Sequence, residues 1–356
     1  MGPVQAESAR MSLKVDIKKR YKGFTLEAAF SSEDGTIALL GASGSGKSMT
    51  LRCIAGLISP DEGVIEIDGR VLFDSGKGID LRPQERRIGY LFQNYALFPN
   101  MTVRQNVEAA YRAEESEGKT EDEEIDMLLG RYHIKDLADR YPVQLSGGEQ
   151  QRTALARIFA CKPLALLLDE PFSALDTYLR ESMQAEMKNI IRNYGGSAIL
   201  VTHSRDEAYR IADDLIILDK GRLTASGSVR DVFRNPGNVR AARVTGCKNL
   251  SEIEKRGERR FFAKDWGIEL EASERIEEKH LYAGIRAHDF IQSETGSVNS
   301  FSFSITDEID SPFEKDLILC PEGGEGKLWW IIGRHENIDG IKALSVAPES
   351  ILLLEA

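Results

Sequence analysis

A glycine-rich segment near the N-terminus has the residue types and the spacing of a phosphate-binding loop. It matches the pattern G-x-x-x-x-G-K-S/T at every position. The residues of the loop are Gly41, Ala42, Ser43, Gly44, Ser45, Gly46, Lys47 and Ser48. Glycines let the backbone curl so that successive N–H groups converge on phosphate oxygens, and the following helix N-terminus adds partial positive charge. We expect Lys47 to reach the β- and γ-phosphates and the Ser48 hydroxyl to ligate Mg²⁺.

A second segment, 145–152, has the sequence LSGGEQQR and opens another helix. Ser146 and Glu149 have the spacing of a capping box, and the two glycines leave the first N–H groups of the helix open to an anion. One nucleotide does not need two such loops from one subunit. A dimer in which this helix caps a nucleotide held by the other copy would use both loops, but from the capping pattern alone an ordinary capped helix is the preferred interpretation.

Two adjacent carboxylates follow an apolar strand at 164–168. Ligand sites in parallel sheets lie at the carboxyl ends of strands. We expect Asp169 to hold Mg²⁺ through its coordination shell and Glu170 to polarise an attacking water as a general base. Without the loop at 41–48, a carboxylate that caps the next turn would be the preferred interpretation of Asp169.

The segment LSGGEQQR resembles the signature sequence of ABC-family ATPases, and further motifs in the order of that family extend the resemblance over about 11–238. In the family, two subunits sandwich two ATP molecules head to tail. The resemblance implies that Ser146, Gly148 and Gln150 contact the ATP of the partner copy. It also identifies the strand that ends at Asp169 as the Walker B motif.

The same resemblance assigns roles to residues that are unremarkable alone. Gln93 resembles the glutamine that ligands Mg²⁺ and links the helical subdomain to a membrane partner. Asp176 lies in a segment similar to the D-loop, which crosses the dimer interface. His203 follows a strand and resembles the histidine that senses the γ-phosphate, although a lone histidine is more often structural. Tyr21 is the expected aromatic platform for adenine, with Phe24 as its rival.

These assignments define the expected site. The expected catalytic residues are Glu170, His203, Lys47 and Gln93, and the expected magnesium ligands are Ser48, Gln93 and Asp169. One departure is Met49, where the family usually has a threonine that helps hold the α-phosphate. The backbone N–H of Met49 can still bind, so we expect a modest effect on affinity. Met49 also replaces the third glycine of the competing dinucleotide fingerprint, which excludes that motif.

Strand and helix patterns predict the scaffold that positions these residues. Apolar strands at 36–40, 164–168 and 198–201 alternate with helical stretches, which indicates a parallel sheet buried on both faces. An Asp-Gly turn between 65 and 73 predicts an antiparallel hairpin. A helical insert is expected at about 94–160. The fold class is therefore an α/β P-loop NTPase domain with a parallel core sheet, an antiparallel β subdomain and a helical insert.

The composition is that of a globular protein of two domains. The chain has 356 residues, 42% hydrophobic and 29% charged, and a formal charge of −11. This acidity argues against nucleic acid as the partner. No apolar run approaches the roughly 20 residues of a membrane helix. We expect a disordered or tag-like segment at 1–10, the nucleotide-binding domain at 11–240, and a transport-associated OB-like all-β barrel of about five strands at 246–356.

The domain order resembles that of the ATPase subunits of bacterial importers. The resemblance implies ATP and Mg²⁺ as cofactors, a homodimer, two transmembrane permease subunits, an indirect extracytoplasmic substrate-binding protein, and a peripheral place at the cytoplasmic face of the membrane. A molybdate, tungstate or sulfate substrate is favoured, partly by Arg86 and Arg87. Iron, polyamine or sugar import is the alternative. Alternatives of another class are a non-transport ABC ATPase and an oxyanion-sensing module that uses the basic stretch at 284–288.

Overall fold

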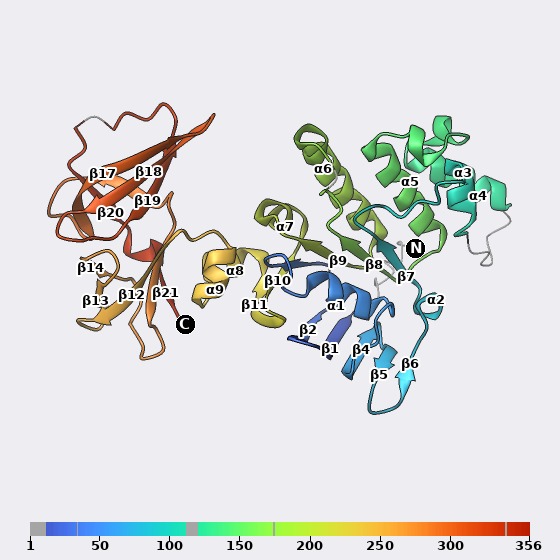
Figure 1. Cartoon of the computed structure of the whole chain (residues 1–356), viewed down its shortest axis with the longest axis horizontal. Coiled ribbons are helices and arrows are strands. Elements are labelled where there is room, and N and C mark those ends of the chain that lie inside the picture. The colour runs from blue at the N-terminus through green and yellow to red at the C-terminus, as the bar shows by residue number, and fades with distance from the viewer. Residues whose placement is uncertain (1–11, 34, 112–119, 174, 339) are drawn as a thin grey trace, which may run out of the picture. The chain divides into compact units, whose positions relative to one another are not determined.

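The computed structural model divides into two compact units, Met1–Val229 and Arg230–Ala356 (Figure 1). It describes residues 12–33, 35–111, 120–173, 175–338 and 340–356. The segment 1–10, expected to be disordered or tag-like, lies outside the described residues. No helix in the described part of the chain is both long and apolar enough to cross a lipid bilayer.

The first unit is built on one eleven-stranded mixed sheet with the order β6-β5-β4-β1-β2-β11-β10-β3-β9-β8-β7. Its parallel part joins β10, β3, β9, β8 and β7, and the remaining strands pair mostly antiparallel. The strands are β1 (Leu13–Tyr21), β2 (Phe24–Ser32), β3 (Thr36–Leu40), β4 (Glu62–Ile67), β5 (Arg70–Asp74), β6 (Ile79–Asp80), β7 (Ile88–Leu91), β8 (Ala165–Asp169), β9 (Ser197–Thr202), β10 (Asp214–Asp219) and β11 (Arg222–Ser228).

The helices of this unit pack on both faces of the parallel strands. They are α1 (Lys47–Ile54), α2 (Pro83–Arg86), α3 (Val103–Glu108), α4 (Glu121–Arg131), α5 (Gly147–Ala160), α6 (Thr177–Tyr194) and α7 (Arg205–Ile211), with short 3₁₀ turns η1 (Lys135–Leu137) and η2 (Pro142–Gln144). Along β8, Leu166 and Leu168 join the hydrophobic cluster under α3 to α6, whereas Leu167 joins the cluster under α1. Alternate side chains thus enter opposite cores, which explains why the strand is apolar throughout.

The helical insert lies between β7 and β8 in the sequence and is held by capped helices. Thr102 caps α3 and Thr120 caps α4, each with a glutamine or glutamate three residues later that completes a capping box. Four acidic residues occupy the first turn of α4, where they favour the positive end of the helix dipole. The acidic run read in the sequence is therefore a helix start.

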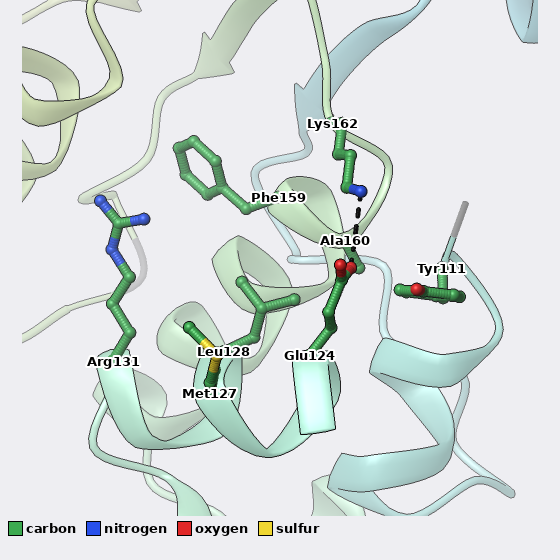
Figure 2. Close-up of a pocket in the computed structure, with 8 residues that line it drawn as sticks. All are labelled: Tyr111, Glu124, Met127, Leu128, Arg131, Phe159, Ala160 and Lys162. Carbon is green, nitrogen blue, oxygen red and sulfur yellow. Dashed lines mark ion pairs between the residues drawn. The ribbon is translucent and has the colours of Figure 1, made fainter. Parts of the chain in front are cut away.

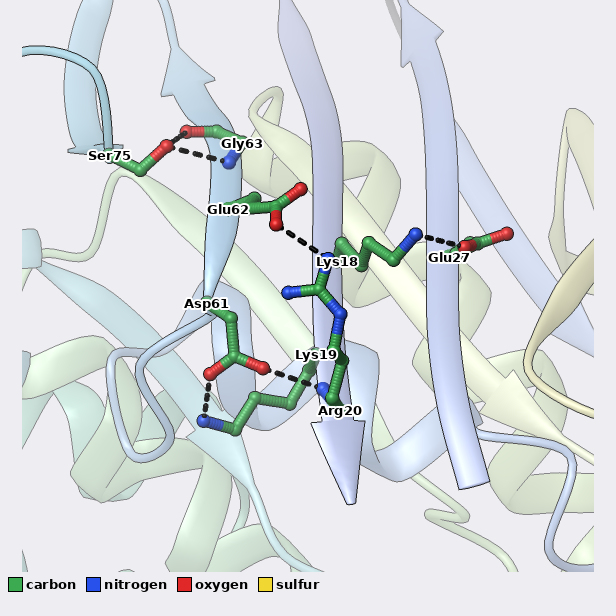
Figure 3. Close-up of polar contacts among 8 residues, drawn as sticks. All are labelled: Lys18, Lys19, Arg20, Glu27, Asp61, Glu62, Gly63 and Ser75. Atoms are coloured by element: carbon green, nitrogen blue, oxygen red, sulfur yellow. Dashed lines mark hydrogen bonds and ion pairs between the residues drawn. The ribbon is translucent and has the colours of Figure 1, made fainter. Parts of the chain in front are cut away.

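The end of β1 is held by polar contacts to the start of β4 (Figure 3). The Asp61 carboxylate accepts hydrogen bonds from Lys19 Nζ at 2.8 Å and from the Arg20 backbone N–H at 2.7 Å. The Arg20 guanidinium lies 2.6 Å from Glu62 Oε1. Because exposed ion pairs contribute at most about 1 kcal/mol each, we infer that these contacts mainly set the position of the strand end that carries Tyr21.

The second unit is all-β apart from two helices near its start, α8 (Val229–Arg234) and α9 (Val239–Val244), and the 3₁₀ turn η3 (Pro348–Ser350). Its two five-stranded sheets have the orders β14-β13-β12-β15-β21 and β16-β20-β17-β18-β19. The strands are β12 (Asn249–Lys255), β13 (Arg260–Ala263), β14 (Ile268–Glu271), β15 (Tyr282–Ile285), β16 (Phe290–Ser293), β17 (Ser300–Asp310), β18 (Glu314–Pro321), β19 (Leu328–Gly333), β20 (Ala343–Val346) and β21 (Ile351–Leu354).

The all-β prediction for the C-terminal half is confirmed, but the expected number of strands was too low. The sequence located β15, β17, β18, β19 and β21 and missed the other five. Four of the five missed strands, β13, β14, β16 and β20, have only four residues, and β14 carries glutamates on alternate positions. Their stability comes from pairing and from the shared core around Trp266 and Trp330, which a local pattern does not reveal.

Arg86 is completely buried and ties the end of α1 to the loop before β7. Its guanidinium donates to the carbonyls of Cys53 and Ile54 at the end of α1, to the Leu81 carbonyl, and to Asp80 Oδ1 at 2.8 Å. Helix C-termini leave such carbonyls without partners. In the sequence, Arg86 is a hint of the transported substrate. The structure gives Arg86 a structural role, because its side chain caps the C-terminal end of α1, the helix that follows the phosphate-binding loop.

An Arg86→Met substitution should destabilise the first unit. The Leu81 and Ile54 carbonyls would lose a donor in a buried place, and the Cys53 carbonyl would keep only the Gly56 N–H. We therefore expect a loss of about 3 kcal/mol in the free energy of unfolding. Urea unfolding followed by circular dichroism at 222 nm measures it. The matched Arg20→Met change, at a half-exposed arginine with one ion pair, should cost less than about 1 kcal/mol.

Tryptophan fluorescence provides a control in the same experiment. All three tryptophans lie in the second unit, at 266, 329 and 330. Their transition should stay where it is in the parent protein. Equal destabilisation by Arg86→Met and Arg20→Met would contradict the capping role of Arg86.

Candidate functional site

The phosphate-binding loop, 41–48, connects the buried strand β3 to α1, as its sequence predicts. Gly46 stands at the N-cap of α1 with φ of 108°, in the left-handed region that favours glycine. A Cβ at Gly46 would lie 2.9 Å from Leu26 Cδ1, and one at Gly41 would overlap the Leu218 carbonyl. Both glycines are therefore required by the close approach of neighbouring strands as well as by the curl of the loop.

Lys47 lies folded into the loop that it follows. Its Nζ donates to the Gly41 carbonyl at 2.8 Å and to the Ala42 carbonyl at 2.9 Å, and the side chain is 5% exposed. Burial lowers the pKa of Lys47, while the carboxylates of Glu170 and Asp169 oppose that shift. A lysine held this way is a cation already placed at the centre of an anion-binding loop.

Asp169 ends β8 and accepts hydrogen bonds from two hydroxyl groups. Ser48 Oγ donates to its Oδ1 at 2.8 Å, and the Tyr90 hydroxyl donates to its Oδ2 at 2.9 Å. Burial and the negative charge of Asp169 raise the pKa of Tyr90, so the phenol stays protonated as a donor. The two predicted residues meet because β8 and the loop after β3 end at one edge of the sheet. Tyr90 was not predicted.

Glu170 follows Asp169 and faces His203. The distance from Glu170 Oε2 to His203 Nδ1 is 3.4 Å. Glu170 has φ of 46°, an uncommon conformation for a residue with a side chain, and its N–H donates to the Val201 carbonyl of β9. Backbone strain of this kind persists where surrounding structure enforces it, and it turns the carboxylate out of the strand.

A cavity of about 390 Å³ opens over the loop and collects predicted residues from distant parts of the chain. Its lining consists of Tyr21, Phe24, Ser43, Gly44, Gly46, Lys47, Ser48, Met49, Arg52 and Glu170. Both candidate aromatic platforms, Tyr21 and Phe24, are present. Thr50 is completely buried and donates to the Gly46 carbonyl, so its hydroxyl does not replace the threonine that Met49 displaces.

Arg52 and Tyr90 are the site residues that sequence reasoning missed. Arg52 lines the cavity one helical turn after Ser48 on α1. The sequence motif predicts a role only for the first turn of this helix. Tyr90 is a polar side chain inside a short strand, and only the parallel pairing of β7 with β8 places it beside Asp169. The position of Arg52 on α1 could have been anticipated, because residues four apart lie on one face of a helix.

The helix α5, which begins with two glycines, has the predicted capping box, but its start does not line the cavity at the phosphate-binding loop. The Ser146 side chain accepts from the Glu149 N–H, and Glu149 Oε2 accepts from the Ser146 N–H at 2.7 Å. The Gln150 side-chain amide donates to the Pro142 and Leu145 carbonyls. Among the described residues, Ser146, Gly148, Gln150, Gln93 and Asp176 do not line the cavity at the phosphate-binding loop.

The helical insert contains a second, more apolar pocket of about 290 Å³ (Figure 2). Leu128, Phe159 and Ala160 are among its apolar lining residues, and Met127, which also lines it, is 57% exposed. Its lining residues are Tyr111, Glu124, Met127, Leu128, Arg131, Phe159, Ala160 and Lys162. Because α5 begins beside Ser146 and ends at this pocket, one helix connects the two places.

Comparison with known proteins supports the interpretation of these motifs. A family model described as "ABC transporter" matches residues 29–173. The chain is 42% identical over 225 residues to the molybdenum import ATP-binding protein ModC of Paramagnetospirillum magneticum, covering 63% of this chain and 61% of that protein. It is 35% identical over 299 residues to the sulfate/thiosulfate import ATP-binding protein CysA of Mesostigma viride, covering 83% of each.

A solved structure resembles part of the chain. It is a dimeric post-hydrolysis state of the ATP-binding cassette MJ0796 bound to ADP and phosphate, with a TM-score of 0.51 and 29% identity. The match covers 62% of this chain and 99% of that one. The predicted fold class of this part of the chain is thereby confirmed.

Proposed function

Because the chain belongs to the ABC transporter family of ATP-binding proteins, we propose that it hydrolyses ATP to drive the import of an oxyanion. The observation that carries the proposal is the convergence of Lys47, Ser48, Asp169 and Glu170 at one edge of the parallel sheet. A cation, a hydroxyl, a buried carboxylate and a turned-out carboxylate are the groups that phosphoryl transfer to water requires.

The loop N–H groups and Lys47 would bind the phosphates, and Tyr21 or Phe24 would stack on adenine. Lys47 would exchange its hydrogen bonds with the Gly41 and Ala42 carbonyls for bonds to phosphate oxygens. The lost threonine hydroxyl at Met49 leaves the backbone N–H as the remaining donor there. Arg52, at the rim of the same cavity, adds a second positive charge near the bound nucleotide.

The oxygen donors at the end of β8 fit Mg²⁺. Ser48 supplies a hydroxyl and Asp169 a carboxylate within 2.8 Å of each other, and Gln93 would supply an amide oxygen. No cluster of three or more His, Cys, Asp or Glu side chains able to hold a metal occurs in the described residues. A small donor set suits Mg²⁺, which keeps several waters and completes its shell with substrate phosphates. When bound, the ion would neutralise charge on those phosphates.

Glu170 and His203 would act on the water and the terminal phosphate. Glu170 would accept a hydrogen bond from the attacking water and take its proton as the bond to phosphorus forms. His203, 3.4 Å from Glu170, would hold the carboxylate and stabilise charge that develops on the phosphoryl oxygens. The leaving ADP would remain on the loop until the site opens.

A homodimer would complete the site. Ser146, Gly148 and Gln150 do not line the cavity at the phosphate-binding loop of their own chain, yet they start a capped helix suited to an anion. Two copies arranged head to tail would bring this helix start onto the nucleotide of the partner. Asp176, exposed just before α6, would lie in the interface.

The apolar pocket of Figure 2 would receive a segment of a transmembrane permease subunit. Its lining includes exposed Met127 with Leu128, Phe159 and Ala160, and α5 leads from it to Ser146. A 14-residue helix moves as a rigid rod of about 21 Å, so closure around ATP at one end would shift the permease contact at the other. The chain would then work peripherally at the cytoplasmic face of the membrane.

The substrate assignment rests on relatives whose names specify molybdenum and sulfate or thiosulfate import. An extracytoplasmic binding protein would deliver the substrate to the permease. The basic stretch at 284–288 does not support an oxyanion site in the second unit, because Arg286 donates to the Thr245 and Phe233 carbonyls. His288 lies 3.6 Å from Glu314.

A Glu170→Gln substitution should abolish turnover and preserve ATP binding. Loss of the general base should reduce ATP hydrolysis by about 100-fold or more. The variant should accumulate as an ATP-bound dimer in size-exclusion chromatography. Glu181→Gln, at an exposed glutamate on α6, is the matched control and should keep parent turnover. If Glu170→Gln hydrolysed ATP at the rate of the parent protein, Glu170 would not be the general base.

A Tyr90→Phe substitution should lower the affinity for the Mg²⁺ that supports nucleotide binding. Losing one hydroxyl that positions Asp169 should raise the Mg²⁺ concentration for half-maximal binding of a fluorescent ATP analogue about 3- to 10-fold. Binding without Mg²⁺ should not change. Tyr95→Phe is the control, since the buried Tyr95 hydroxyl has no partner in the described structure. Equal effects of the two substitutions would argue against the positioning role.

A Met127→Glu substitution should uncouple transport from hydrolysis. A charge at the rim of the apolar pocket should prevent docking of the permease, so vesicles with the reconstituted complex should accumulate at least about tenfold less molybdate, tungstate or sulfate. The isolated variant should keep its ATPase activity. Leu57→Glu, another exposed apolar residue, should transport normally. Accumulation of iron, polyamine or sugar instead of any oxyanion would correct the substrate assignment.

A further inference from the structure

The second unit carries a long hairpin whose distal part extends beyond its sheet (Figure 1). We call residues 304–316 of this hairpin the β17–β18 arm. β17 has eleven residues, but β20 pairs only with its first three, Ser300, Phe301 and Ser302. On its other side, β17 pairs with β18 as far as Asp310. From 304 to 310, one edge of β17 has no strand beside it in the described structure.

At the other side of the same sheet, the edge strand is covered. β19 is the last strand there, and its outer edge is covered by other parts of the chain. Asn249 accepts from the Trp329 N–H at 2.6 Å and donates to the Trp329 carbonyl at 2.9 Å. The Ile331 N–H donates to the Ala287 carbonyl. Covering an edge in this way is how proteins prevent unwanted strand pairing, and no strand among the described residues covers the arm in this way.

The arm is braced although it is exposed. Arg334, just after β19, donates its N–H to the Phe313 carbonyl at 2.9 Å and its guanidinium to the Pro312 carbonyl. The Ser311 N–H donates to the Glu314 carbonyl and closes the turn. A braced hairpin loses little conformational entropy when a partner binds.

Exposed apolar side chains gather on the arm. Ile305 is 42% exposed, Ile309 is 44% exposed, and Phe313 at the tip is 85% exposed. Residues 304–310 of β17 are all exposed. The Glu308 N–H donates to the Asp307 side chain at 2.9 Å. An open strand edge flanked by exposed apolar residues is what strand addition uses, with backbone hydrogen bonds for affinity and side chains for specificity.

The charge of the arm determines the chemistry of its partner. Five carboxylates stand against one lysine, Lys315; they are Asp307, Glu308, Asp310, Glu314 and Asp316. Lys315 pairs with Glu308, and Lys248 pairs with Asp316. Asp307 has no ion pair in the described part of the chain. Two arms placed edge to edge would bring like charges together, which destabilises cross-strand pairs.

We propose that the free edge of β17, residues 304–310, with the tip residue Phe313, binds an extended, basic segment of a partner protein as an added strand. The seven residues span about 24 Å, enough for a strand of ordinary length. Lysine or arginine side chains of the segment would face the carboxylates of the arm, and apolar residues between them would cover Ile305 and Ile309. This surface shares no residue with the set proposed for hydrolysis.

The test uses the full-length protein and a fluorescein-labelled seven-residue peptide of alternating lysine and valine. Fluorescence anisotropy should show saturable binding. The same peptide with alternate backbone nitrogens methylated keeps its charge but loses hydrogen-bond donors, and should bind at least about tenfold more weakly. A peptide of alternating glutamate and valine should not bind.

Variants locate the site. Ile309→Lys and Phe313→Ser should each weaken peptide binding at least about fivefold. Ile291→Lys alters an exposed isoleucine of β16, an edge strand of the same sheet outside the arm, and should leave peptide binding unchanged. Circular dichroism checks that each variant folds, and the use of two arm variants keeps the test decisive if one does not.

Several results would overturn the proposal. Equal binding of the methylated peptide would show that charge alone attracts it, and unchanged binding by both arm variants would place the site elsewhere. Absence of any peptide binding would reject strand addition. Sedimentation of the protein without nucleotide tests whether a second copy of this chain occupies the edge. Self-association that Ile309→Lys abolishes would mean that the edge pairs with a second copy.

Discussion

The parallel pairing of β3, β9, β8 and β7 is the constraint on which the candidate site depends. Parallel strands bring their carboxyl ends to one edge of a sheet, so the loop after β3 and the carboxylates after β8 must meet. The contact of Ser48 with Asp169, across 121 positions of sequence, is the direct result. Burial on both faces keeps these strands rigid, which is why short polar contacts at their ends persist.

At that edge of the sheet, the fold holds a buried charge and a strained backbone, both of which raise the free energy of the folded protein. Lys47 is buried among carbonyls with Asp169 and Glu170 near enough to oppose the lowering of its pKa. Glu170 adopts an uncommon backbone conformation. Such features persist only where the surroundings enforce them, and they cluster at functional sites. Arg86 contributes to these surroundings, because it holds the C-terminal end of α1, the helix that follows the phosphate-binding loop.

The second unit solves a different physical problem, the management of sheet edges. β19 is covered through Asn249 and Ala287, whereas the distal part of β17 is left open and acidic. Charge on an open edge discourages pairing between identical chains, but it does not discourage a basic strand. The same acids that protect the edge from self-association therefore select the kind of partner that it can accept.

The sequence by itself determined the phosphate-binding loop, the capped helix at Ser146, the paired carboxylates at Asp169 and Glu170, and the all-β character of the C-terminal half. Each of these depends on local chemistry: glycine conformations, cap hydrogen bonds, or an apolar run with polar residues at its end. Tertiary structure alone decided that Tyr90 joins the site and that Arg86 caps α1. It also decided which strand edge stays open. Those outcomes depend on which strands and helices become neighbours, and long-range pairing leaves no local signal in the residues that it brings together.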